Sequence, residues 1–159
     1  MKTIPHCLEC GIPVSWGVHL FSRRIYGHCL CIKDQCMIQE SGATGQVVDL
    51  YLGLKALGIP VVLRHYDGKQ FADIALPDQL YVKVKGPCSQ GRNQITSDLF
   101  GNIESGGRRL ITVLISHSTL ENPVTFELAL KEIAKICRKL VKKKVVTGMK
   151  FSFSPTQWQ

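Results

Sequence analysis

Cysteines are concentrated at the start of this chain of 159 residues, where five of its seven cysteines fall within the first 36 positions. Cys7 and Cys10 form a C-x-x-C pair, and Cys31 follows after a further 20 residues. Two thiolates separated by two residues hold one tetrahedral zinc ion from a tight turn, and a second pair of ligands completes such a site. The spacing therefore predicts a structural zinc site, whereas the odd number of cysteines does not indicate a disulfide framework.

The fourth zinc ligand has two candidates. Cys36 has the preferred ligand type but lies five positions after Cys31, and Asp34 has the usual spacing with a weaker ligand. Cys36 is the first choice and Asp34 is the alternative; His28 and Cys29 are further neighbours. A zinc ion held by four protein ligands has no open position, so we expect the site to stabilise the fold and to perform no chemistry.

A second group of reactive side chains lies in the segment DIALPDQLYVKVKG, residues 73–86. Side chains alternate along a strand, so Lys83 and Lys85 are expected to share one face with Tyr81. Asp73 belongs to the preceding predicted strand, on which it is expected to approach the two lysines. An acid and two ammonium groups would then meet on one side of a sheet, where the lysines are suited to binding phosphate.

The motifs taken together resemble the restriction-endonuclease-like proteins of the PD-(D/E)XK nuclease superfamily, in particular small bacterial members with an N-terminal zinc finger. The resemblance covers most of residues 7–140 and implies an α/β (α+β) fold, a mixed sheet flanked by helices behind a small zinc-binding segment. It also implies that Asp34 stands where the finger has its last cysteine. The segments that carry it are CLECG (7–11), FSRRIYG (21–27), LCIKD (30–34), YDG (66–68), LYVKVKG (80–86), SDLF (97–100) and LITVLISHSTLENP (110–123).

The same resemblance implies a degenerate nuclease site. In such nucleases acids on two neighbouring strands hold Mg²⁺, which activates the attacking water, and Asp73 matches the first acid. Lys83 and Lys85 stand where the family has its further acids, and an ammonium group removes an oxygen ligand and repels the cation. We therefore expect a catalytically impaired protein that binds nucleic acid, with Mg²⁺ only if another acid restores activity. The acids available for that role are Asp49, Asp78 and Asp98.

Positive charge is concentrated near the C-terminus. The chain holds 20 Lys and Arg against 12 Asp and Glu, and residues 131–150 account for +7 of the net +8. On a helix these cations fall opposite the apolar stripe, in a row that matches a phosphate backbone. We expect DNA rather than RNA as the partner. The predicted nucleic-acid-binding residues are Lys83, Lys85, Arg92, Lys135, Lys139 and Lys142.

Hydrophobic periodicity predicts the elements that position these groups. The sequence predicts a helix over 44–57, strands over 61–65, 71–75, 80–85 and 110–116, a short helix within 90–104, and a long helix that Asn122 caps. Residues 1–38 contain few helix formers. The linker-like segment ESGAT (40–44) separates a zinc-finger-like segment, residues 1–40, from an endonuclease-like domain, residues 41–159.

Composition narrows the class of protein further. A content of 45% hydrophobic and 20% charged residues excludes a disordered or low-complexity chain. The longest apolar stretch, Val47–Leu63, is interrupted by Asp49, Lys55 and Pro60, and the first ten residues lack the apolar core of a signal peptide. We expect a cytoplasmic protein without membrane contact. Two alternative functions stay open: an active Mg²⁺-dependent endonuclease with a relocated acid, and a zinc-finger protein–protein adaptor.

Overall fold

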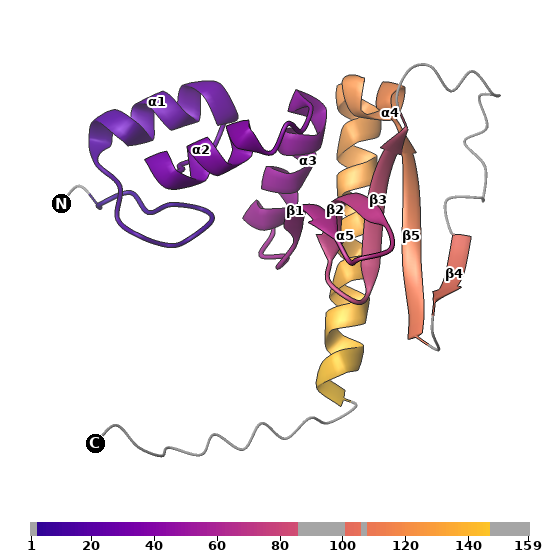
Figure 1. The fold of residues 1–159 in the computed structure, drawn as a ribbon. Coiled ribbons are helices and arrows are strands. Elements are labelled where there is room, and N and C mark those ends of the chain that lie inside the picture. The colour runs from indigo at the N-terminus through magenta and orange to yellow at the C-terminus, as the bar shows by residue number, and fades with distance from the viewer. Residues whose placement is uncertain (1–2, 86–100, 106–107, 147–159) are drawn as a thin grey trace, which may run out of the picture.

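Helices and strands alternate along the chain in a mixed α+β arrangement (Figure 1). The computed structural model describes residues 3–85, 101–105 and 108–146. The helices are α1 (Trp16–Tyr26), α2 (Ile32–Glu40), α3 (Gly45–Ala56), α4 (His117–Glu121) and α5 (Pro123–Val146). The strands are β1 (Val62–Tyr66), β2 (Phe71–Leu76), β3 (Leu80–Lys85), β4 (Gly101–Ser105) and β5 (Arg108–Ser116).

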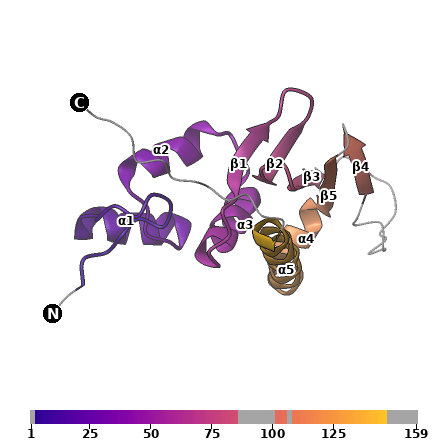
Figure 2. The same cartoon turned by 90° about the horizontal axis from the view of Figure 1, so that it is seen from below.

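The strands form one five-stranded sheet in the order β1-β2-β3-β5-β4. β3 and β5 are parallel, from the pair Leu80–Ile111 to the pair Lys85–Ser116, and the other neighbours are antiparallel. Figure 2 shows α3, α4 and α5 on the same side of this sheet. The predicted mixed sheet with packed helices is therefore confirmed, with α3, α4 and α5 covering one face.

The hydrophobic core lies between the sheet and the long helices. Because side chains alternate along a strand, Val82 and its partner Ile74 both point to the helical layer, where neither is exposed. Burying one such aliphatic side chain stabilises the fold by about 1.5–3 kcal/mol. The helices contribute buried side chains from α3 and α5, among them Val47, Leu50, Leu54, Ile133 and Cys137.

The zinc-finger-like segment packs onto this core. Cys7, Val14 and Leu30 belong to the same buried cluster as the side chains of α3 and the sheet. The predicted boundary at residue 40 coincides with the end of α2, but buried side chains from both sides of it form one hydrophobic cluster.

Most of the predicted elements of the α/β part are confirmed to within one or two residues. One prediction is wrong: residues 101–105 form strand β4, which pairs with β5, rather than the end of a short helix. The apolar spacing of Ile95, Leu99 and Ile103 fits a helix, but edge pairing with a long strand decides the conformation of the last of these residues. Residues 90–100 lie outside the described part of the chain. Helices α1, α2 and α4 are not predicted by the sequence.

Helix α5 begins as its sequence predicts. The Asn122 side chain accepts a hydrogen bond from the Val124 N–H at 2.9 Å, and Pro123 occupies the first helical position. Ile133 and Cys137 on α5 are buried, whereas Val141 is 36% exposed. In the part of the chain that the structure describes, no helix combines the length and apolar composition needed to cross a membrane.

Candidate metal centre

The CLECG segment forms a tight turn that turns two thiols toward each other. The Cys7 N–H donates to the Ile12 carbonyl at 2.8 Å, and the Gly11 N–H donates to the Cys7 carbonyl at 2.9 Å. Gly11 has a φ of +72°, a conformation that glycine adopts without steric cost. The turn therefore places the side chains of Cys7 and Cys10 on one side of the backbone.

The other half of the centre is the start of helix α2. Cys31 is the residue that precedes the first turn of α2, and Asp34 lies in that turn. The Cys31 N–H donates to the Cys7 sulfur at 3.2 Å, and the Leu8 N–H donates to the Cys29 carbonyl at 2.8 Å. These backbone contacts fix the turn against the helix.

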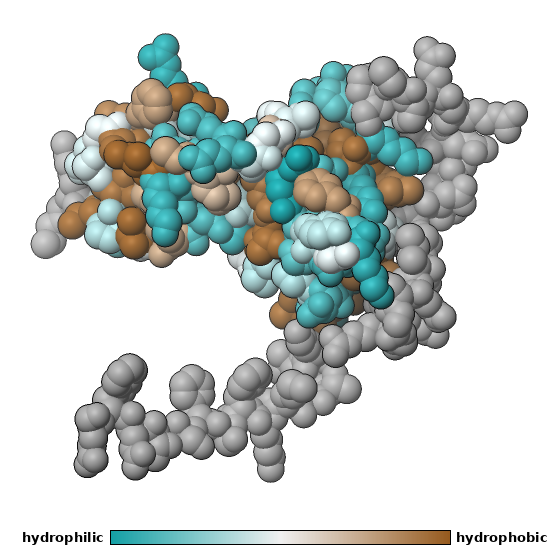
Figure 3. Space-filling model, in the orientation of Figure 1, coloured by the Kyte–Doolittle hydropathy of each residue, from teal (hydrophilic) through white to brown (hydrophobic). Residues whose placement is uncertain are grey.

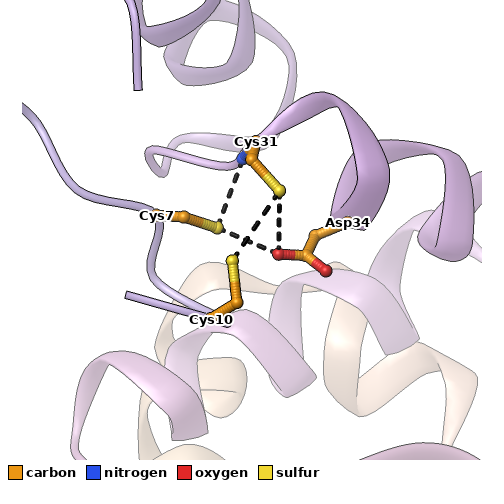
Figure 4. Close-up of side chains that lie close together, drawn as sticks. All are labelled: Cys7, Cys10, Cys31 and Asp34. Atoms are coloured by element: carbon orange, nitrogen blue, oxygen red, sulfur yellow. Dashed lines mark hydrogen bonds between the residues drawn. The ribbon is translucent and has the colours of Figure 1, made fainter. Parts of the chain in front are cut away.

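Four ligand atoms converge between these two segments (Figure 4). The sulfur atoms of Cys7, Cys10 and Cys31 and a carboxylate oxygen of Asp34 all lie within 4.8 Å of one another. The Cys10 and Cys31 sulfurs are 3.8 Å apart, and the Asp34 Oδ2 is 3.1 Å from the sulfurs of both Cys7 and Cys31. A tetrahedral zinc ion with Zn–S distances of about 2.3 Å separates its sulfur ligands by about 3.8 Å. The group is compatible with zinc after small shifts.

The structure favours Asp34 over Cys36 as the fourth ligand. Successive residues of an α-helix are rotated by about 100°, so Cys36, five positions after Cys31, lies about 140° around the helix from it. Asp34 lies three positions after Cys31, which is the N-cap of α2. Side chains at the N-cap and three positions later lie close together, as in a capping box. Cys36 is exposed, and neither it, His28 nor Cys29 belongs to the group. Our first choice of Cys36 is therefore corrected to the alternative.

The ionisable groups of the centre respond to burial and to one another. Burial raises the pKa of the Cys31 thiol to about 12. Burial alone would also raise the pKa of the Asp34 carboxyl, but hydrogen bonds from the three thiols hold that pKa below its ordinary value. A bound divalent cation favours the thiolate form, because metal binding releases the thiol protons.

Glu9, inside the C-x-x-C turn, connects the centre to helix α3. Its carboxylate accepts a hydrogen bond from the Tyr51 hydroxyl at 2.7 Å and pairs with the Lys55 ammonium group at 2.9 Å. Burial, and then the hydrogen bond to Glu9, raises the pKa of Tyr51 above its ordinary value. The sequence gives no signal for this contact, since Tyr51 lies 42 positions away and no spacing rule relates the two residues.

The predicted cluster of Asp73, Lys83 and Lys85 is arranged differently. The Asp73 carboxylate accepts the Val84 N–H at 2.8 Å and a hydrogen bond from the Arg64 guanidinium group at 3.4 Å. The Lys83 ammonium group donates to the Gln70 side chain at 3.0 Å. Lys85 is exposed. Asp73 thus pairs with Arg64 rather than with either lysine.

The end of the pairing between β2 and β3 explains this outcome. Ala72 and Ala75 of this strand belong to one small buried cluster with Tyr81 of β3. The pairing of β2 with β3 covers residues 74–76 of β2. Next to these pairs, the Asp73 carboxylate accepts a hydrogen bond from the Val84 N–H. Arg64, on the neighbouring strand, has a φ of 54°, an uncommon backbone conformation for a residue other than glycine.

The proposed replacement acids do not join Asp73 in the described residues. Across residues 3–85, 101–105 and 108–146, the single group of three or more possible metal ligands is the one built on Cys7, Cys10, Cys31 and Asp34. Asp49 lies on α3, where burial raises the pKa of its carboxyl. Asp78 lies in the turn between β2 and β3. Asp98 and Arg92 lie outside the described residues.

The cationic residues of α5 lie on its exposed side, as predicted. Lys135, Lys139 and Lys142 are all exposed, and so are Lys131 and Arg138. Lys131 pairs with a glutamate of the same helix at 3.3 Å, and Lys135 pairs with another at 3.6 Å. Exposed pairs of this kind contribute about 0–1 kcal/mol, so they leave the cations available to a partner.

Comparison with protein-family models, curated proteins and solved structures gives no match for this chain. The resemblance to the PD-(D/E)XK superfamily therefore rests on the sequence motifs. The Cys₃Asp group rests on the geometry of its own side chains and does not depend on that resemblance.

Proposed function

We propose that this chain is a zinc-containing protein that binds the phosphate backbone of DNA through helix α5 and does not cleave it. The observation that carries the proposal is the row of exposed cations on this helix, which we call the cationic side of α5. Its members are Lys131, Lys135, Arg138, Lys139 and Lys142.

The dimensions of this row suit a duplex. Residues at intervals of three and four share one side of a helix, and at 1.5 Å per residue the row from Lys131 to Lys142 is about 17 Å long. Duplex DNA carries one charge per about 1.7 Å of its axis, so a segment of that length presents about ten phosphates. Arg138, Lys139 and Lys142 form no ion pair with any residue that the structure describes.

The absence of cleavage is supported by the contacts of Asp73. Its carboxylate is occupied by the Val84 N–H and by Arg64, and Lys83 is bound to Gln70. A hard cation such as Mg²⁺ needs several oxygen ligands to replace part of its hydration shell. One engaged carboxylate beside two lysines does not supply them.

We further propose that the α/β part has a restriction-endonuclease-like fold. The order of one helix and three antiparallel strands, followed later by the parallel strand β5 and a long helix, supports this assignment. Under it, zinc at the Cys₃Asp group holds the N-terminal segment on the core and takes no part in chemistry.

The test is a binding and cleavage assay on the zinc-loaded chain. Fluorescence anisotropy with a labelled 20-base-pair duplex should show binding at low salt that weakens in the triple variant Lys135→Gln, Lys139→Gln and Lys142→Gln. A matched triple variant, Arg24→Gln, Lys33→Gln and Lys69→Gln, removes the same charge elsewhere and should bind nearly as well as the wild type. Equal losses in both variants, or cleavage with Mg²⁺ or Mn²⁺ that disappears in Asp73→Ala, would contradict the proposal.

A further inference from the structure

Helices α1 and α2 expose large apolar side chains. Trp16, Leu20, Phe21 and Ile25 on α1 and Ile32 on α2 are each between 49% and 64% exposed. Figure 3 shows brown side chains gathered over this part of the molecule. Isolated exposed apolar residues are common, but a contiguous group of them usually marks an interaction site.

A groove lies within this apolar surface. Its walls come from α1 and α2, and its volume is about 370 Å³. Phe21 and Ile32 line it from opposite helices. Gln35 and Gln39 also line it on the α2 side, and their amides donate to the Leu30 carbonyl and the Tyr26 hydroxyl. An apolar groove between two helices is the type of surface that accepts one face of an amphipathic helix. The residues of this α1–α2 groove are Gly17, Val18, Phe21, Ile32, Gln35, Cys36 and Gln39.

Two exposed cations lie next to residues that line the α1–α2 groove. Arg24 follows Leu20 and Phe21 by four and three positions, so it lies beside both on the surface of α1. Lys33 directly follows Ile32 on α2. Both cations are exposed, and neither they nor Arg23 form an ion pair with any residue described in the structure.

One exposed acid borders the groove together with these cations. Glu9 is paired with Lys55 and Tyr51 of α3. Asp34 is buried in the Cys₃Asp group. Glu40, the last residue of α2, follows the groove residue Cys36 by four positions and therefore lies beside it, about two turns beyond Lys33. Arg24 and Lys33 against Glu40 leave this border with a net positive charge, which complements an acidic partner.

We propose that the α1–α2 groove binds an acidic amphipathic helix of a partner protein. Apolar side chains of the partner fill the space between Phe21 and Ile32, and its carboxylates face Arg24 and Lys33. This interaction is independent of nucleic-acid binding, because the cationic side of α5 is a separate surface.

Other occupants fit the surface less well. A second copy of the chain would bring one basic border against another, and like charges at an interface cost several kcal/mol. A membrane surface would have to bury the guanidinium group of Arg24 between Leu20 and Phe21, which is costly in hydrocarbon. Nucleic acid would leave the apolar side chains without a matching surface.

The experiment is a selection from a displayed library of random 16-residue peptides on the zinc-loaded full chain. Enriched peptides should carry a net negative charge and large apolar residues at intervals of three and four. Their affinity, measured by fluorescence anisotropy, should fall at least tenfold in the double variant Phe21→Ser and Ile32→Ser. It should also fall at least tenfold in Arg24→Glu with Lys33→Glu, a surface change that leaves the packing intact. Leu128→Ser with Lys69→Glu, which alters exposed residues elsewhere, should leave the affinity unchanged.

Several results would overturn the proposal. No enriched peptide, enriched peptides without an acidic bias, or affinities that ignore the charge reversal would each do so. Self-association in sedimentation that the double variant abolishes would identify a second copy as the occupant. Binding to phosphatidylserine-containing vesicles that the same variant abolishes would identify a membrane.

Discussion

Replacing Asp34 tests the metal centre most sharply, because the sequence offers Cys36 as a competing fourth ligand. In Asp34→Ala the centre loses the carboxylate oxygen that lies 3.1 Å from two of its sulfurs. In Cys36→Ser it loses nothing, since the exposed Cys36 is outside the group. The two variants should therefore differ strongly in their affinity for zinc.

The size of the difference follows from the ligand count. Structural zinc binds small zinc-finger peptides with an apparent free energy of about 10–16 kcal/mol at neutral pH. An equal share for each of four ligands is about 2.5–4 kcal/mol, which corresponds to a loss of roughly 10²- to 10³-fold in affinity. Cys36→Ser should change the affinity by less than about threefold, because a surface substitution away from the ligands stays within about 0.5 kcal/mol.

The assay is competition for zinc with a chromophoric chelator, together with absorption spectra of the cobalt-substituted protein. Asp34→Cys provides a matched variant in which a fourth thiolate replaces the carboxylate. It should keep the metal and raise the thiolate-to-cobalt charge-transfer absorbance by about one third, from three thiolates to four. Retention of the metal in Asp34→Ala with its loss in Cys36→Ser would refute the Cys₃Asp assignment.

Three further predictions follow from contacts elsewhere in the fold. Glu9→Gln should lower the free energy of unfolding, measured in urea, by about 1–3 kcal/mol, because it removes a charged hydrogen-bond partner from Tyr51 and Lys55. The control Glu127→Gln breaks an exposed ion pair and should lower it by at most about 1 kcal/mol. Hydrogen bonds from the backbone of Gln70 and Lys69, and then from Tyr81, lower the pKa of Asp67 to about 2. The stabilising effect of the ionised Asp67 is therefore complete above about pH 4 and is lost as the pH falls toward 2. The difference in unfolding free energy between the wild type and Asp67→Asn should shrink over that range, and a constant difference would contradict the assignment. Ile133→Ala should lower the free energy of unfolding by about 2–5 kcal/mol, because this side chain is buried. Leu128→Ala should lower it by less than about 0.5 kcal/mol, because that side chain is exposed. Equal decreases in urea denaturation would contradict the orientation of α5.

Periodicity predicts the parts of this fold in which one face of an element is buried. The apolar spacing in α3 and α5 and the alternation in β3 correspond to the side chains that pack in the core. Capping also follows from the sequence at the start of α5, where Asn122 and Pro123 act locally. These features depend on neighbours within a few residues, which is the range that sequence patterns describe.

The N-terminal helices escape prediction for a physical reason. The sequence of α1, WGVHLFSRRIY, combines aromatic, β-branched and glycine residues of modest helix propensity. Its buried residue Ser22 accepts a hydrogen bond from the Leu30 N–H at 3.1 Å, a contact across the loop that precedes α2. Tertiary contacts therefore stabilise this helix. The fourth metal ligand is likewise hard to predict, because Asp34 rather than Cys36 lies near Cys31 only when residues 32–40 form helix α2.

The pairing of strand β2 limits the prediction of the second site. Strict alternation would place Asp73 beside the lysines of β3. The pairs of β2 with β3 instead cover residues 74–76, and the Asp73 carboxylate accepts the Val84 N–H. Where two strands stop pairing depends on both of them, and the sequence of one strand does not reveal it.

The most direct test of DNA binding by the cationic side of α5 is the dependence of affinity on salt. Each neutralised phosphate contributes about −0.9 to the slope of log K against log salt concentration. Five contacts give a slope of about −4.5, or a loss of roughly 500-fold between 50 and 200 mM salt. The triple variant Lys135→Gln, Lys139→Gln and Lys142→Gln keeps two of the five cations and should show a slope of about −1.8, a loss of roughly 12-fold. Equal slopes for the two proteins, or binding that does not respond to salt, would contradict the account.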